Sequence, residues 1–389
     1  MPVNLAPRPS RCAVCESLPE LPSGAGRLDL WLPAAHAQGK TMGALRRLGL
    51  APRTGDAFGV SVDVGTAPLG ALVGTVADAL TSVEVEDTRV LFSPAGAAPT
   101  AADLARVASL ARFRALLDAG WIVALLEAER LASLFQPIVL GADPACVIGH
   151  EALLRGVGDD GSLLPPFPLF EGARRAGLLF QLDLAARRTH IANAAARRLD
   201  GLLFLNFTPT AIYDPAMCLR STVAAIDAAG IAHDRVVFEV VEFEGPADTD
   251  HLRRILDYYR AAGFRVALDD VGAGYSSLNR LHLLRPDLIK LDLQLVRDVH
   301  TDPYKALVAE KLLELAQSLG IPVLAEGVET EGELHWLQAR EVTYLQGYLF
   351  GRPAAEPRTV APLPRGAELV SLLPTDRRAP AADAGELLR

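Results

Sequence analysis

Acidic side chains and one Asn recur along this chain at the ends of short apolar runs. These runs are VIGHEALLR with Glu151, LLFLNF with Asn206, VVFEVVE with Glu239, VALDD with Asp269 and Asp270, and VLAEGVE with Glu326. In a barrel of parallel strands, such ends meet at one rim. Two like charges about 4 Å apart repel by roughly 4 kcal/mol at an effective dielectric constant of about 20. The pattern therefore predicts a bound cation, and oxygen ligands suit Mg²⁺, Mn²⁺ or Ca²⁺.

The order of the predicted elements indicates an α/β fold. From Phe135 to about Pro353, short buried strands alternate with helical segments. The strands are FQPIVL, VIGHEALLR, LLFLNF, VVFEVVE, RVALDDV, LIKLDL, PVLAEGVE and YLQGYLF, and the helices span 182–198, 215–229, 250–262, 303–319 and 331–339. This alternation is typical of a (β/α)₈ TIM barrel. Because GADPAC joins the first two strands and is short enough for a hairpin, we expect one strand to run antiparallel.

The residues before the barrel predict a smaller α/β domain. Residues 1–24 are rich in Pro, Gly and Ser and are expected to be irregular. Over 25–98, RLDLWLP, AFGVSVDV and VEVEDTRVLF alternate like strands, and LGALVGTVADAL has a helical period. Thr100 can cap the first helix of a helical connector over 99–130. The barrel is expected over 131–355 and a mobile tail over 356–389.

Composition excludes several classes of protein. The net charge is −9, and the Lys and Arg residues are scattered, which argues against general nucleic-acid binding. No run of about 18 apolar residues predicts a membrane span, and residues 1–20 lack the apolar core of a signal peptide, so we expect a cytoplasmic protein.

Cys12 and Cys15 form a CxxC that is read either as two ordinary thiols or as a metal or redox pair with His36 nearby.

The acidic runs also predict a chemistry. Asp269 and Asp270 are adjacent, and Gly272 follows them, so both carboxylates can turn toward one cavity and hold two ions about 3.5–4 Å apart, a common arrangement for phosphodiester hydrolysis. Lys290 lies inside the apolar strand LIKLDL, where it serves either as a structural salt bridge, for which Asp292 is the expected partner, or as a cation beside the scissile phosphate. Arg155 could bind a phosphate through two hydrogen bonds.

Eight motifs in order resemble the EAL family of cyclic-di-GMP phosphodiesterases. They are FQPI (135–138), Glu151-Ala152-Leu153 followed by LRG, LNFTP (205–209), FEVVE (238–242), DDVGAGYSSL (269–278), DLIKLD (287–292), AEGVET (325–330) and QGYLFGRP (346–353). The resemblance implies a modified TIM barrel that opens cyclic-di-GMP to linear pGpG with two Mg²⁺ or Mn²⁺ ions, and so lowers a bacterial second messenger. It also implies a homodimer formed through the barrel.

The resemblance assigns roles by motif position. It implies that one ion is held by Glu151, Asn206, Glu239 and Asp269, and the other by Asp269, Asp270 and Glu326. Lys290 orients or helps to deprotonate the attacking water, with Glu151 and Glu326 also placed in the catalytic set. Gln346 assists near the metal site. The residues assigned to the dinucleotide are Gln136, Leu154, Arg155, Gln346 and Pro353. Glu242 steadies the loop after the paired aspartates, and Glu329 supports the site.

Departures from the family pattern keep two alternatives open. Val271, Ala273 and Gly156 replace the Phe, Thr and Trp that are common at their positions, although no metal ligand and no lysine is lost. One alternative is a catalytically silent receptor that relays cyclic-di-GMP binding through the N-terminal domain. The other is a barrel metallohydrolase for a different phosphodiester. The N-terminal domain itself is read either as a packing or dimerisation module or as an input module with a protein or ligand partner.

Overall fold

The computed structural model describes residues 17–65, 68–97, 100–212, 214–240, 249–272 and 277–359. Predictions that concern Cys12, Cys15, Glu242, Ala273 or the tail from 360 onward lie outside these ranges. The chain divides into two compact units. One contains residues 131–164 and those from 183 onward, and the other contains 17–130 and 165–182.

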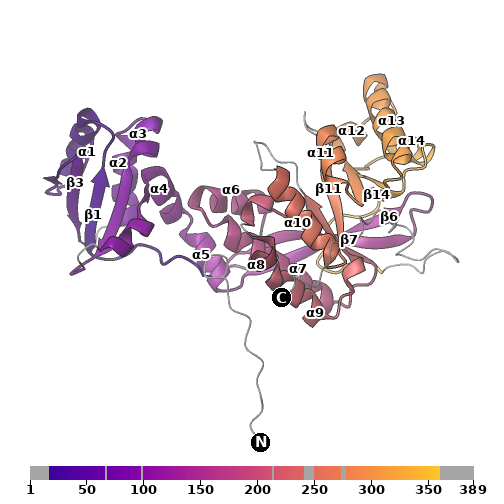
Figure 1. Cartoon of the computed structure of the whole chain (residues 1–389), viewed down its shortest axis with the longest axis horizontal. Helices are drawn as coiled ribbons and strands as arrows, with labels where there is room; N and C mark the ends of the chain where they lie inside the picture. The colour runs from indigo at the N-terminus through magenta and orange to yellow at the C-terminus, as the bar shows by residue number, and fades with distance from the viewer. Residues whose placement is uncertain are drawn as a thin grey trace, which may run out of the picture. The chain divides into compact units, whose positions relative to one another are not determined.

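The larger unit is a closed barrel (Figure 1). Its strands are β6 (Leu131–Leu140), β7 (Val147–Val157), β9 (Leu202–Phe207), β10 (Val236–Val240), β11 (Arg265–Val271), β12 (Leu288–Leu291), β13 (Val323–Ala325) and β14 (Tyr344–Gln346). Neighbouring strands run parallel except at β6, which is antiparallel to β14 and to β7. The modified TIM barrel with one antiparallel strand, which the sequence predicted, is therefore confirmed.

Helices and short turns connect the barrel strands. They are α7 (Leu179–Ala196), η2 (Pro209–Ala211), α8 (Pro215–Cys218), α9 (Arg220–Ala229), η3 (His233–Arg235), α10 (Thr249–Ala261), α11 (Ser277–Leu284), α12 (Leu293–Val296), α13 (Pro303–Ser318) and α14 (Glu331–Gln338), and β8 (Leu163–Leu164) pairs with the end of β7. Within the described residues, no helix is both long and apolar enough to cross a bilayer.

The barrel core lies directly beneath the acidic rim. Phe204, Val237 and Ala267 are fully buried in it, and each comes two residues before a polar or acidic residue of the predicted site. Since side chains two apart on a strand share a face, the same inward face is apolar at one level and polar at the next. The apolar layer thus fixes the strands that carry the site.

The smaller unit is an antiparallel sheet with helices. In the described residues its strands are β1 (Gly26–Trp31), β2 (Arg53–Thr54), β3 (Gly59–Val64), β4 (Arg89–Pro94) and β5 (Ala108–Ser109), in the order β2-β3-β1-β4-β5. Its helices are α1 (Ala35–Arg47), α2 (Leu69–Asp78), α3 (Ser82–Asp87), η1 (Ala101–Arg106), α4 (Leu110–Asp118), α5 (Gly120–Glu127) and α6 (Pro166–Ala176). The last of these groups with this unit although it follows β8 in the sequence.

One predicted strand is a helix for part of its length. The alternation over 83–92 predicts a strand, but 82–87 form α3, and β4 begins only at Arg89. Thr81 Oγ1 accepts a hydrogen bond from the backbone N–H of Glu84, and the Glu84 carboxylate accepts one from the backbone N–H of Thr81. This capping box starts a helix that the valine alternation does not reveal.

Glu84 gives an expected pH dependence for the smaller unit. The backbone N–H of Thr81 and the Lys40 ammonium hold the pKa of Glu84 at about 2, below its ordinary value of 4.5. A lowered folded-state pKa stabilises the fold above about pH 4.5, and this contribution is lost as the pH falls toward 2. Thermal unfolding should therefore show Glu84→Gln less stable than the wild type at pH 7, with the difference shrinking toward pH 2. Glu314→Gln, at an exposed ion pair with Lys311, should change little at either pH.

Candidate metal-dependent active site

The acidic residues predicted at the strand ends are brought to one rim of the barrel. Glu151 and Asn206 lie on the adjacent parallel strands β7 and β9, and Glu239 on β10 is the register partner of Asn206. Gln136 on β6 is the register partner of Glu151, so its side chain shares the inward face. The parallel register of the barrel is therefore sufficient to place these side chains side by side.

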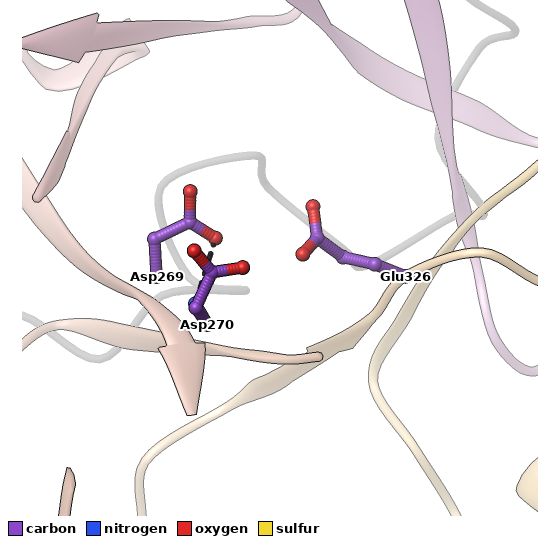
Figure 2. A group of neighbouring side chains, drawn as sticks. All are labelled: Asp269, Asp270 and Glu326. Atoms are coloured by element: carbon purple, nitrogen blue, oxygen red, sulfur yellow. Dashed lines mark hydrogen bonds between the residues drawn. The ribbon is translucent and has the colours of Figure 1, made fainter. Parts of the chain in front are cut away.

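A β-bulge turns both adjacent aspartates toward the same point. The register of β11 with β12 shifts between Leu268 and Val271, and Asp270 has φ 53°, in the left-handed region that Asp tolerates better than most residues. Gly272 then has φ 109°. Figure 2 shows the carboxylates of Asp269 and Asp270 facing that of Glu326, which follows β13.

Lys290 occupies the centre of the acidic cluster. It is 1% exposed, and its Nζ lies 2.7 Å from Glu326 Oε1, 2.9 Å from Glu239 Oε1, 3.1 Å from Asp269 Oδ1 and 3.9 Å from Glu151 Oε1. Burial alone would lower the pKa of Lys290, but these carboxylates raise it well above its usual range. Lys290 is therefore a protonated cation that holds the carboxylates together.

Glu151 is the best supported carboxylate of the cluster. Its Oε1 accepts a hydrogen bond from Asn206 Nδ2 at 2.8 Å, and its Oε2 accepts one from Gln346 Nε2 at 2.7 Å. Burial acts to raise the pKa of Glu151, but Lys290 and the two amides outweigh burial and lower it. Glu151 is thus fixed in position as an anion.

The remaining carboxylates are short of positive charge. Burial and the Glu151 carboxylate raise the pKa of Glu239 well above its usual range, although Lys290 Nζ lies 2.9 Å from its Oε1. Burial, with a further contribution from Asp269, raises the pKa of Glu326 to about 8 despite Lys290. One ammonium group therefore does not compensate this cluster.

The donor set fits a hard divalent cation. Oxygens of Asp269, Asp270 and Glu326 lie within 4.8 Å of one another (Figure 2). A cation held there would supply the charge that Glu326 lacks, and carboxylate oxygens are the ligands that Mg²⁺, Mn²⁺ and Ca²⁺ prefer. The geometry and the charge imbalance point to the same kind of ligand.

The predicted substrate residues are divided between two faces. Gln136 and Arg155 share the inward face of their strands with Glu151, and Gln136 Nε2 is 3.5 Å from the carbonyl of Gly351. Leu154 is buried on the opposite face of β7, where its register partner is Ser133. Pro353 is half-buried and precedes Ala354, which pairs with Phe135 on β6.

Two residues near the site have contacts that differ from simple expectation. The expected partner of Lys290, Asp292, instead caps α12 by accepting a hydrogen bond from the backbone N–H of Gln294 at 2.8 Å. Glu329 is exposed and accepts a hydrogen bond from Arg297 Nη2 at 2.9 Å. Asp292 therefore binds the backbone and Glu329 binds a neighbouring side chain, and both acids lie outside the carboxylate cluster around Lys290.

A residue that the sequence reasoning missed is Glu333. It is 2% exposed at the start of α14, and its carboxylate binds the backbone of the segment that follows Glu326. The signal was present in the sequence as the capping box Thr330-Glu331-Gly332-Glu333. Glu333 itself lies outside the motifs that carry the family resemblance, three residues after the end of AEGVET (325–330).

Comparison with known proteins identifies the family of this barrel. The model of the EAL domain family matches residues 114–353. The chain belongs to the EAL domain family. It is 33% identical over 228 residues to the probable cyclic di-GMP phosphodiesterase PdeG of Escherichia coli K12, covering 56% of this chain and 44% of PdeG. It is 34% identical to an uncharacterized signaling protein of Caulobacter vibrioides, covering 57% of this chain and 27% of that protein. The chain therefore spans less than half the length of either relative.

Solved EAL structures share the fold. A standalone EAL protein from Vibrio cholerae O395, in its c-di-GMP-bound form, is 35% identical with a TM-score of 0.53 and covers 58% of this chain and 92% of its own. BlrP1 of Klebsiella pneumoniae, in a complex with calcium and cyclic-di-GMP, is 25% identical with a TM-score of 0.53 and covers 85% of this chain and 96% of its own. The match to BlrP1 therefore covers a larger share of this chain than the match to the V. cholerae protein does.

Proposed function

We propose that this EAL domain hydrolyses cyclic-di-GMP to linear pGpG with two divalent ions, Mg²⁺ or Mn²⁺. The observation that carries the proposal is the cluster of carboxylates around Lys290, together with the group of oxygens that Asp270 forms with Asp269 and Glu326. The name of PdeG and the cyclic-di-GMP-bound state of the V. cholerae protein support this choice of substrate.

The residues of this chain would divide the work as follows. Glu151, Asn206, Glu239 and Asp269 would hold one ion, and Asp269, Asp270 and Glu326 the other. A bound divalent ion supplies Lewis acidity, which acidifies a water molecule and offsets charge on the phosphate. Lys290 is held protonated, so it donates hydrogen bonds and orients the groups around it. Arg155 and Gln136, on the inward face of their strands, would bind the dinucleotide.

A second candidate function is a receptor that binds cyclic-di-GMP without cleaving it. One relative, 28% identical over 221 residues, is named a blue light- and temperature-regulated antirepressor, BluF of E. coli K12, and carries no enzyme name. Val271, which stands where the family commonly has Phe, is buried at the end of β11. This replacement therefore alters the packing of the strand end and removes no proposed metal ligand.

Turnover separates the two candidates. Purified protein is incubated with cyclic-di-GMP and Mg²⁺ or Mn²⁺, with and without EDTA, and the products are resolved by chromatography. Formation of pGpG that EDTA abolishes supports the phosphodiesterase. Nucleotide binding without product supports the receptor, and absence of both binding and product contradicts both proposals.

The barrel also offers a surface for a homodimer. On α13, Tyr304, Leu307 and Val308 are 83%, 56% and 50% exposed, and their spacing places them on one face of the helix. An exposed apolar stripe of this kind is typical of a protein contact. We therefore propose that a second copy of the barrel packs against α13.

A charge on this stripe should separate the two copies. Leu307→Glu is expected to convert a dimer to a monomer in light scattering coupled to gel filtration, with the melting temperature of the folded barrel nearly unchanged because the side chain is exposed. Leu163→Glu, on β8 at 50% exposure, is the matched control and should leave the dimer intact. A monomeric wild type, or a dimer that survives Leu307→Glu, would exclude this surface.

A further inference from the structure

The backbone that follows Glu326 is fastened by the buried carboxylate of Glu333. Glu333 Oε2 accepts hydrogen bonds from the backbone N–H groups of Glu329 at 2.8 Å and Thr330 at 2.9 Å. Thr330 Oγ1 accepts one from the backbone N–H of Glu333 at 3.3 Å. The two oxygens of a carboxylate can bind separate donors, so Glu333 retains a second oxygen for another contact.

That second oxygen reaches a different part of the barrel. Glu333 Oε1 accepts a hydrogen bond from the backbone N–H of Asp298 at 2.9 Å, two residues beyond the end of α12. Burial acts to raise the pKa of Glu333, but the three backbone donors outweigh it and lower the pKa. Glu333 therefore links the loop after β13 to the segment after β12 through one buried anion.

The helix α12 packs against both backbone segments that carry the carboxylates of Figure 2. A Cβ on Gly327, the residue after Glu326, would lie 2.6 Å from Leu293 Cβ. A Cβ on Gly272, two residues after Asp270, would collide with Leu295 Cδ1. Both glycines also have positive φ, at 71° and 109°. Leu293 and Leu295 thus fill the space beside the two loops, and glycine is needed at each contact.

We propose that Glu333 is a positioning residue for the metal site, acting through α12 to set the distance between the Asp269–Asp270 pair and Glu326. The inference rests on the proposed function only in requiring that these carboxylates bind a divalent cation. Glu333 reaches one loop directly, through Glu329 and Thr330. It reaches the other through Asp298 and α12, whose Leu295 packs on Gly272. Groups that hold metal ligands in place change affinity by about 10–100-fold when they are altered.

Glu333→Gln separates this role from helix capping. Gln is an ordinary capping-box residue, and its single carbonyl oxygen can still accept from Glu329 and Thr330. Its amide group would then face the backbone N–H of Asp298, so two donors oppose each other and this contact is lost. The variant should fold, weaken Mn²⁺ binding by about tenfold or more, and regain turnover as the Mn²⁺ concentration is raised. Free Mn²⁺ is measured by electron paramagnetic resonance.

Glu84→Gln is the matched control because Glu84 forms the same capping box with Thr81 in the other unit. It should leave Mn²⁺ affinity unchanged. Leu295→Ala, which removes the side chain beside Gly272 without touching Glu333, is the second variant and should also weaken Mn²⁺ binding. Circular dichroism confirms that each variant is folded.

The outcomes distinguish this inference from the proposed function. If the wild type binds Mn²⁺ but forms no pGpG, the phosphodiesterase is excluded, and the affinity ratio of Glu333→Gln still decides the present inference. If the wild type binds and cleaves but Glu333→Gln or Leu295→Ala binds Mn²⁺ like the wild type, the coupling through α12 is overturned and the enzyme stands. A wild type that binds no Mn²⁺ overturns both.

Discussion

Replacing Glu151 with alanine is expected to abolish hydrolysis of cyclic-di-GMP. Glu151 is the carboxylate whose charge the site holds most firmly, through Asn206, Gln346 and Lys290. Loss of a group that merely supports a metal ligand costs up to about 100-fold in activity, and loss of a proposed ligand should cost more. The measurement is pGpG formation at saturating Mn²⁺.

The same variant should also lose stability. Asn206 Nδ2 and Gln346 Nε2 would keep their positions without their acceptor, and a buried donor left unsatisfied costs about 1–3 kcal/mol. Glu314→Ala removes an exposed carboxylate on α13 and is the control for charge alone. Turnover within a few fold of the wild type in Glu151→Ala would remove this residue from the site and with it the proposed metal arrangement.

The barrel was predictable because its signal is repeated along the chain. Each strand appears as a short apolar run, and five of these runs carry acidic residues or an asparagine that the parallel strands bring to the same rim. The antiparallel strand could be inferred from the length of the connection between the first two strands. GADPAC is too short for a crossover helix, and β6 indeed pairs antiparallel with β7.

Other features depend on contacts that the sequence pattern does not encode. The sequence predicted that Asp269 and Asp270 both turn toward one cavity, but not how: a regular strand would point them to opposite faces, and the register shift and the left-handed φ of Asp270 bring them together. The helix α3 forms where the alternation of valines predicts a strand, because a local capping box outweighs a weak periodic signal. The link from Glu333 to Asp298 spans 35 residues and has no local pattern that announces it.

Replacing Lys290 with methionine is expected to reduce kcat by about 10²–10³-fold, the usual cost of removing one preorganised electrostatic group from an active site. Lys290 lies within 4 Å of four carboxylates, so its ammonium is placed to act on the charge that develops during the reaction. Binding of cyclic-di-GMP should fall less than kcat, because the proposed role belongs to the transition state. A comparable loss of affinity would instead assign Lys290 to phosphate binding.

Stability without metal tests whether Lys290 is only a structural ion pair. Removing one partner of a buried pair usually destabilises a fold by about 3–5 kcal/mol, because the other charge stays buried. Lys290→Met should therefore unfold more readily in EDTA, and added Mn²⁺ should restore much of the difference. A double variant combines Lys290→Met with Glu239→Gln. The second change removes a carboxylate whose Oε1 lies 2.9 Å from Lys290 Nζ in the wild type. Stability should partly return there. Turnover of Lys290→Met itself, measured once Mn²⁺ has restored its stability, decides the role of the lysine, because a purely structural lysine predicts that activity recovers together with stability.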